Sequence, residues 1–255
     1  MKSLTKFLLN KIPRPLLIKA SIWARPLIVQ FFRGNRFTDP IDGKSYRKFL
    51  PYGYGKQREN ALSPGTLSLE RHRQMWLYLQ KETEFFTKKQ KVLHIAPEQE
   101  FFRRFRRMKN LEYISADLYS PLVDVKADIL DLPFDDESFD IVFCNHVLEH
   151  IDDDRKAMRE LYRVMRKGGW GILQVPLKNT LEKSYEDSSI KDPKERQKHF
   201  GQYDHVRWYG MDYFQRLHET GFEVDINYYS RNFSAADRLK YGLLENEILP
   251  VVFKK

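Results

Sequence analysis

The chain contains 255 residues, of which 42% are hydrophobic and 14% aromatic, and it carries a formal net charge of +9. This composition can fill a packed core, which excludes a disordered chain, and the single cysteine, Cys144, excludes an intramolecular disulfide. No apolar run reaches the roughly 18 residues of a membrane span. The N-terminus also lacks a secretory pattern, so we expect a cytoplasmic protein.

The positive charge belongs to the N-terminal segment. Residues 1–38 hold eight of the 44 basic residues and none of the 35 acidic ones, so the remainder is nearly neutral. Prolines 13, 15 and 26 divide residues 1–36 into short predicted helices rich in Leu, Ile, Phe and Trp. Such a basic, amphipathic arm suits the inner face of an anionic membrane. It suits packing on the main domain equally well, and contact with RNA is a third interpretation.

Residues 37–68 form a predicted module rich in glycine and proline. Its segments 37–44 and 62–67 resemble the two knuckles of a zinc ribbon, with Asp39, Asp42, Ser63 and Thr66 at the ligand positions. Because a working ribbon needs thiolates or imidazoles there, we expect no metal. Hydrogen bonds from turn amides to Asp39 and Asp42 are the expected substitute. An ordinary pair of turns explains these residues equally well.

Residues 69–255 alternate predicted helices with short apolar strands. We expect helices over 67–86, 98–109, 152–167 and 211–220, and strands over 91–95, 111–116, 123–127, 139–144, 170–175, 222–229 and 247–253. Gly168 and Gly169 are expected to end the third helix. This alternation predicts an α/β fold with a doubly wound, mainly parallel sheet of seven strands. The polar stretch at about 177–205 predicts an insertion or lid.

Polar residues follow the ends of successive predicted strands, which meet at one edge of a parallel sheet. They are His94 to Glu100, Asp117, Asp128 with Ile129, and Asn145 with His146. A carboxylate at Asp117 is suited to accept hydrogen bonds from a ribose diol. Asp128 is suited to an exocyclic amine, and Ile129 to a purine face. Each carboxylate alone reads as a turn or cap residue, but together they indicate a nucleoside-type cofactor.

The middle of the chain resembles a known family. The string Ala127-Asp-Ile129, the segment Leu132–Val142, Val147-Leu-Glu-His150 and the segment Glu160–Gly169 are similar to class I S-adenosylmethionine-dependent methyltransferases of the small-molecule and lipid type. The resemblance implies a Rossmann-like fold with S-adenosylmethionine as cofactor. The implied cofactor-binding residues are His94, Ala96, Pro97, Glu98, Asp117, Leu118, Asp128, Ile129, Asn145 and His146.

The first strand departs from the family pattern. His94 stands where an acidic residue is usual, and Ala96 to Glu100 replace the glycine-rich loop. We interpret this turn as a variant and expect methyl transfer to a small-molecule, glycan or lipid-linked acceptor. The alternatives are a non-catalytic cofactor-binding or scaffold protein of the same fold and an RNA methyltransferase.

The acceptor side is expected beyond the fifth strand. Residues 199–209 are dense in polar aromatic side chains, and His205 lies beside Asp204. We predict His205, His146 and Tyr203 as catalytic residues that bind the acceptor or remove its proton. The alternative is a hydrogen-bonded corner that anchors the lid.

Overall fold

The computed structural model describes residues 26–53 and 57–255, so most of the predicted basic arm lies outside the described residues. The chain divides into two compact units. The first contains the described residues up to Leu77 together with Ser230–Glu245, and the second contains Tyr78–Tyr229 and Asn246–Lys255. The structure therefore divides the chain at Leu77 rather than at residue 68, and it adds a C-terminal segment to the first unit. In the described part of the chain, no helix combines the length and the apolar character needed to cross a membrane.

The first unit is built from two antiparallel hairpins and helical segments. Residues 26–32 are helical, and they precede β1 (Arg33–Thr38), β2 (Ser45–Tyr46), β3 (Leu50–Tyr52), β4 (Arg58–Leu62), most of α3 (Glu70–Lys81) and α8 (Ala235–Tyr241). β1 pairs with β2, and β3 pairs with β4. Phe37, Tyr46 and Phe49 form a small buried aromatic core between these elements.

The four ribbon-like positions are held by hydrogen bonds. Asp39 is buried, and it accepts bonds from the Ile41 amide at 2.9 Å and from the hydroxyl of Thr66, which joins the two loops. Asp42 accepts from the Lys44 amide at 2.9 Å. Ser63 accepts from the amide of Gly65 at 3.3 Å. Each aspartate therefore accepts from a turn amide, as the sequence predicts, while descent from a zinc ribbon stays a prediction.

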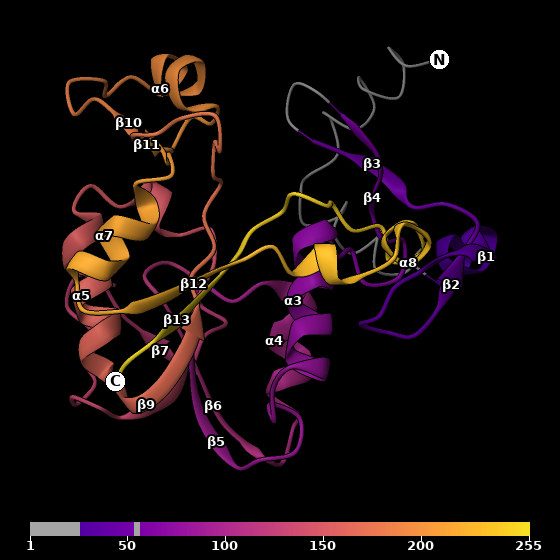
Figure 1. Cartoon of the computed structure of the whole chain (residues 1–255), viewed down its shortest axis with the longest axis horizontal. Helices are drawn as coiled ribbons and strands as arrows, with labels where there is room; N and C mark the ends of the chain where they lie inside the picture. The colour runs from indigo at the N-terminus through magenta and orange to yellow at the C-terminus, as the bar shows by residue number, and fades with distance from the viewer. Residues whose placement is uncertain (1–25, 54–56) are drawn as a thin grey trace. The chain divides into compact units, whose positions relative to one another are not determined.

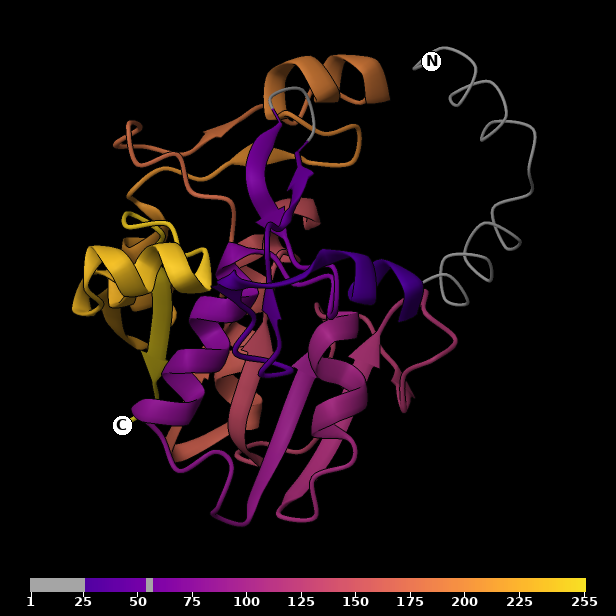
Figure 2. The same ribbon diagram turned by 90° about the vertical axis from the view of Figure 1, so that its right-hand side faces the viewer.

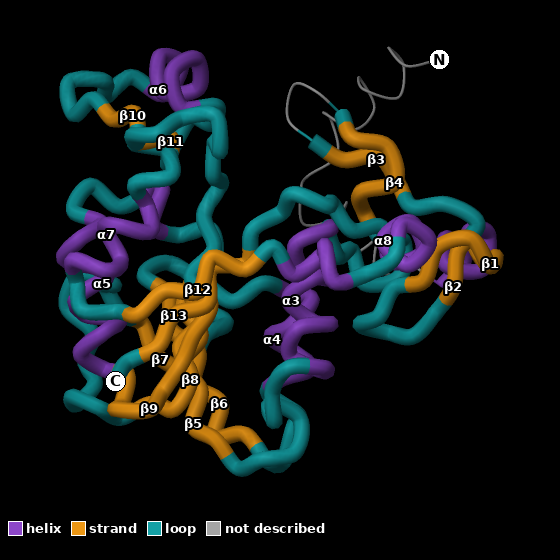
Figure 3. The backbone as a smooth tube through the Cα atoms, viewed as in Figure 1, coloured by secondary structure: helices purple, strands orange, loops and turns teal. Residues whose placement is uncertain are grey.

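The second unit carries the large sheet. Its strands are β5 (Gln90–Ile95), β6 (Leu111–Asp117), β7 (Val125–Lys126), β8 (Phe139–Cys144), β9 (Met165–Ile172), β12 (Glu223–Asn227) and β13 (Leu249–Phe253). Its helices are α4 (Gln99–Phe105), α5 (Asp154–Val164), α6 (Pro193–Phe200) and α7 (Tyr213–Glu219), with a 3₁₀ turn at Leu148–His150. A further 3₁₀ turn, Tyr229–Asn232, belongs mainly to the first unit. Figure 1 and Figure 3 show α5 and α7 on one side of this sheet and α4 on the other.

The strand order is β12-β13-β9-β8-β5-β6-β7. The pairs from β9 to β7 are parallel, whereas β13 is antiparallel to both of its neighbours. This confirms the predicted doubly wound, mainly parallel sheet. Figure 2 shows the arrows of the parallel strands ending at one edge. The chain winds outward in opposite directions from β5 and β8, and such a reversal opens a crevice at the carboxyl ends of the strands.

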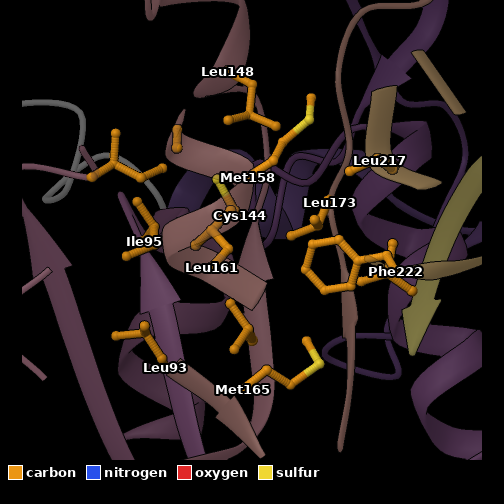
Figure 4. Packing of buried hydrophobic residues seen from close by; sticks show 14 of the residues in the cluster. Leu93, Ile95, Cys144, Leu148, Met158, Leu161, Met165, Leu173, Leu217 and Phe222 are labelled. Atoms are coloured by element: carbon orange, nitrogen blue, oxygen red, sulfur yellow. The ribbon is translucent and has the colours of Figure 1, made fainter. Parts of the chain in front are cut away.

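The core of the second unit joins the sheet to α5. Met158 and Leu161 of α5 lie near Cys144 of β8 and Ile95 of β5 (Figure 4), and all four side chains are buried in one hydrophobic cluster. Burying each such side chain contributes roughly 1.5–3 kcal/mol. The cluster fixes the sheet against α5 and so holds the ends of β5 and β8 in place.

The predicted boundary between the third helix and the fifth strand was wrong. The helix expected over 152–167 ends at Val164, and β9 starts at Met165 rather than at residue 170. Met165 pairs with Phe139 of the neighbouring strand, and Arg166 forms an ion pair with Asp140. The basic residues that resemble a helix C-terminus therefore belong to a strand, where the carboxylate of Asp140 on β8 stabilises Arg166.

The predicted insertion forms a small hairpin and a helix. It contains β10 (Tyr185–Glu186), α6, and β11 (Arg207–Trp208), which pairs with β10. Arg207 donates to the carbonyls of Leu148 at 2.9 Å and Asp152 at 2.8 Å, and so ties β11 to the segment that follows β8.

Candidate active site

A cavity of about 400 Å³ opens at the carboxyl ends of β5, β6 and β8. This volume falls within the usual range of small-molecule sites. Most of its lining is apolar, with a few carboxylates and imidazoles. The residues are Ile95, Ala96, Asp117, Leu118, Tyr119, Ala127, Asp128, Ile129, His146, Val147, His150, Ile151 and Asp204. The sequence therefore predicted six of the lining residues as cofactor-binding: Ala96, Asp117, Leu118, Asp128, Ile129 and His146.

Two carboxylates of the lining each accept hydrogen bonds through one oxygen only from the described residues. Oδ1 of Asp117 accepts from the amides of Tyr119 at 2.7 Å and Ser120 at 2.6 Å. Oδ1 of Asp128 accepts from the Leu130 amide at 2.9 Å. The amide bonds fix both carboxylates, and the described residues supply no hydrogen bond to either Oδ2. These oxygens are therefore placed to accept hydrogen bonds from a polar ligand.

The turn after β5 adopts a backbone conformation that favours glycine. Ala96 has φ +45°, and its amide donates to the carbonyl of Ala116 at 2.8 Å. His146, after β8, has φ +56°, and its amide donates to the carbonyl of Gln174 at 2.8 Å. The substitution of Ala96 for a glycine therefore keeps the left-handed backbone at the cavity wall, at a cost of roughly 1–2 kcal/mol.

Four predicted cofactor residues lie outside the cavity lining. His94 is completely buried, and its ring contacts Glu98 at 2.8 Å and the Tyr113 hydroxyl at 3.0 Å. Asn145 is also buried, and its side chain accepts from the Gln174 amide at 3.2 Å. Pro97 is absent from the lining. His94 and Glu98 therefore form a pair that joins β5 to the start of α4.

The segment after β8 combines imidazoles with a buried carboxylate. Nδ1 of His146 donates to Oε1 of Glu149 at 3.2 Å, and Nδ1 of His150 donates to the carbonyl of Asp204 at 3.2 Å. Burial alone would raise the pKa of Glu149, but the hydrogen bond from His146 and the nearby imidazole of His150 hold that pKa below its usual value. Glu149 is therefore an anion in a buried position.

The other two predicted catalytic residues occupy different environments. His205 is 1% exposed and packs its ring against that of His150, with centroids 4.8 Å apart. Burial lowers the pKa of His205, which favours the neutral imidazole. Tyr203 is 63% exposed. Of the three predicted catalytic residues, His146 alone appears in the lining of the described cavity.

The predicted catalytic residues include neither His150 nor Glu149. His150 lines the cavity. Glu149 lies three residues after His146, and this spacing is the signal that a carboxylate can orient an imidazole on one helical turn.

A second cavity, of about 600 Å³, lies beside the insertion. Its charged lining is largely used within the protein, because Arg207 contacts Glu186 at 2.8 Å and Asp154 at 3.8 Å. Asp154 also contacts Arg216 at 3.0 Å. These ion pairs hold the insertion on α5 and α7, so the smaller, more apolar cavity is the better ligand site.

The sequence profile of a family described as a methyltransferase domain matches residues 83–173. The chain is 50% identical over 42 residues to the uncharacterized methyltransferase YcgJ of Bacillus subtilis, which is 16% of this chain and 17% of that protein. It is 35% identical over 65 residues to the ubiquinone/menaquinone biosynthesis C-methyltransferase UbiE of Idiomarina loihiensis, which is 24% of this chain and 26% of that protein. These matches span about a quarter of the relatives' length or less.

A crystal structure of an S-adenosylmethionine dependent methyltransferase from Mesorhizobium loti aligns with a TM-score of 0.48 at 13% identity, covering 70% of this chain and 95% of that chain. The family match extends over the strands from β5 to β9, and it includes the ends of β5 and β6 and the segment after β8 that line the cavity. By this match, residues 83–173 of the chain are similar to a methyltransferase domain.

Proposed function

We propose that this protein transfers the methyl group of S-adenosylmethionine to a small-molecule, glycan or lipid-linked acceptor. The observation that carries the proposal is the 400 Å³ cavity, in which Asp117 and Asp128 each hold one oxygen without a hydrogen bond from the described residues. A nucleoside offers the matching donors, a ribose diol and an exocyclic amine.

The apolar lining supports the same assignment. Ile129 and Leu118 flank the two carboxylates in the lining and offer surfaces on which a purine ring can pack. Bound S-adenosylmethionine supplies an electrophilic methyl group, so the protein has mainly to align the acceptor with it and exclude water. We assign the acceptor to the part of the cavity near His146, with the predicted residues His205 and Tyr203 beyond it.

Calorimetry tests the cofactor assignment. Titration of the full chain with S-adenosylmethionine and with S-adenosylhomocysteine should give one site per chain with a dissociation constant in the micromolar range. Folded protein that binds neither ligand at millimolar concentration would contradict the proposal and favour the scaffold alternative.

A panel of acceptors then tests the reaction, with release of S-adenosylhomocysteine as the readout. Quinols belong first in the panel because UbiE is named for ubiquinone and menaquinone biosynthesis, and glycans and lipid-linked hydroxyl compounds follow. Turnover with RNA, lost steeply as salt rises, would instead support the RNA alternative.

The basic N-terminal segment supports a second, separate proposal, that the protein binds an anionic membrane surface. Its eight basic residues, without an acidic one, would attract anionic headgroups. Vesicles containing phosphatidylserine should sediment the wild-type chain and release it when Lys2, Lys6 and Lys11 are changed to Glu. Equal sedimentation of both proteins would contradict this proposal.

A further inference from the structure

Glu149, His150 and His205 bring three potential metal-ligating side chains together beside the cavity. One ligand atom from each residue lies within 4.8 Å of the other two. Glu149 is 1% exposed and His205 is 1% exposed, whereas His150 reaches the cavity lining. Two imidazoles and one carboxylate are a common ligand set of catalytic zinc sites, which keep a further position open.

Several atoms in this cluster lack the hydrogen bonds that buried polar groups require. Oε2 of Glu149 and both ring nitrogens of His205 are buried and have no hydrogen bond of normal geometry with the described residues, although the backbone carbonyl of Phe200 lies near the His205 ring. An unsatisfied buried polar group destabilises the folded state. Orphaned atoms on two different side chains at one place point to a missing partner, and one cation would satisfy both.

Neighbouring residues orient two side chains of this cluster. Nδ1 of His150 donates to the carbonyl of Asp204, so Nε2 is the ring nitrogen that remains for a metal ion. His146 holds Oε1 of Glu149 and leaves Oε2 for another partner. Metal-binding side chains are usually oriented by such outer hydrogen bonds.

The backbone fixes the spacing between the two segments. The amide of Val206, next to His205, donates to the carbonyl of Glu149 at 2.9 Å. Arg207 donates to the carbonyl of Leu148 at 2.9 Å. The two ligand-bearing segments are therefore connected next to the cluster. Metal binding would bring the ligand atoms from within 4.8 Å of one another to the spacing of a tetrahedral site, about 3.4 Å for metal–ligand distances of about 2.1 Å.

We propose that Glu149, His150 and His205 bind a divalent transition-metal ion of the Zn²⁺ class at the edge of the cavity. His150 places this ion next to the bound ligand, with one position open toward the cavity. An oxygen of the acceptor would fill that position, and the ion would lower the pKa of a hydroxyl so that its proton leaves to water before methyl transfer. This role for the ion, though not its binding, rests on the proposed methyl transfer.

Zinc titration tests the site directly. The full chain is stripped with a chelator and titrated with Zn²⁺ against a chromophoric competitor, and Co²⁺ replaces zinc as a spectroscopic probe. We expect one zinc per chain and visible cobalt bands of a four- or five-coordinate site. His205→Gln and Glu149→Gln should each weaken the affinity for zinc by roughly tenfold to a hundredfold. His218→Gln, at an exposed histidine of α7, is the matched control and should bind zinc like the wild type.

Three results would overturn the metal site. They are zinc binding no tighter than that of free imidazole, unchanged zinc binding in both Glu149→Gln and His205→Gln, and loss of zinc on Asp39→Asn, which would assign it to the ribbon-like loops. Circular dichroism confirms that each variant is folded, and the cobalt spectrum of the wild type requires no variant. Binding of S-adenosylmethionine is measured on the stripped protein, so a failed cofactor assignment and a failed metal site give different results.

Discussion

Ala96 and His146 both have a positive φ, and each follows one of two neighbouring strands of the sheet. The angle is +45° at Ala96, after β5, and +56° at His146, after β8. Both residues line the cavity. Left-handed backbone is costly for residues with a Cβ, and it tends to persist where the surrounding structure forces it, often at functional sites. Two such residues at one cavity mark the crevice between β5 and β8 independently of any side-chain chemistry.

Replacing Ala96 with glycine should stabilise the protein. The change removes about 1–2 kcal/mol of left-handed strain, and the extra chain entropy of glycine offsets roughly 0.5–1 kcal/mol of that gain. We expect a net increase of about 0.5–1 kcal/mol in the free energy of unfolding, measured by urea denaturation. Ala96→Val should lower it. If Ala96→Gly destabilises the protein, the backbone strain at this turn is not as described.

Asp117→Asn tests the proposed ribose contact. The asparagine oxygen can still accept from the amides of Tyr119 and Ser120, so the turn should survive. The charge and one acceptor oxygen are lost, and we expect roughly tenfold weaker binding of S-adenosylmethionine by calorimetry. Asp135→Asn, at an exposed position between β7 and β8, is the control and should bind normally. Equal affinities of both variants would remove Asp117 from the cofactor site.

The sheet was predictable because its central strands are short apolar runs between helical patterns. Leu93, Ile141 and Val142 are completely buried, as strands covered on both faces require. The end of α5 was not predictable in the same way. Arg166 is stabilised by Asp140 on a neighbouring strand, and a contact between residues so far apart in the sequence leaves no local pattern.

The sequence predicted the site residues that follow the ends of strands. It did not predict whether a polar residue within a strand points toward the cavity or into the core. Asp117 and Asp128 reach the cavity because they follow the strands, where the chain turns over the sheet edge. His94 lies one residue before the end of β5 and points into a buried aromatic cluster with Phe105 and Phe143. Successive side chains of a strand point to opposite faces of the sheet. When most residues of the strand are apolar, the sequence does not show which face a single polar residue occupies.

Arg73→Lys should strongly destabilise the first unit. The buried guanidinium donates to the carbonyls of Ala61 at 3.0 Å, Ser68 at 2.7 Å, Tyr241 at 2.7 Å and Gly242 at 2.8 Å. Burial lowers the pKa of Arg73 to about 10. A lysine has three donors on one nitrogen and cannot reach all four carbonyls, and each unpaired carbonyl costs about 1–3 kcal/mol.

Hydrogen exchange measures this effect locally. Amides of residues 58–62 and 235–243 should exchange faster in Arg73→Lys, because the guanidinium joins these two segments. Arg36→Lys, at an exposed position of β1, should change the free energy of unfolding by less than about 0.5 kcal/mol. Unchanged protection in Arg73→Lys would show that α8 is held by other contacts.

Glu186 should make the stability of the insertion depend on pH. Partial burial would raise its pKa, but hydrogen bonds from Arg216 at 3.0 Å and Arg207 at 2.8 Å outweigh burial and lower it. A carboxylate with a lowered pKa in the folded state stabilises that state above its unfolded pKa of about 4.3, and this contribution is lost as pH falls through the folded pKa. Glu186→Gln should therefore be less stable than the wild type at pH 7, and the difference should shrink below about pH 4.

The side chain of Glu186 is 40% exposed, so screening by solvent limits the difference at pH 7 to roughly 1 kcal/mol. Urea denaturation of both proteins from pH 7 to pH 3 measures it. Glu182→Gln, at an exposed residue of the same insertion, should follow the wild-type curve. A carboxylate that titrates loses its contribution to stability as the pH falls. If the free energies of unfolding of Glu186→Gln and the wild type instead differ by a constant amount over this range, the ion pairs with Arg207 and Arg216 do not set the stability of the insertion.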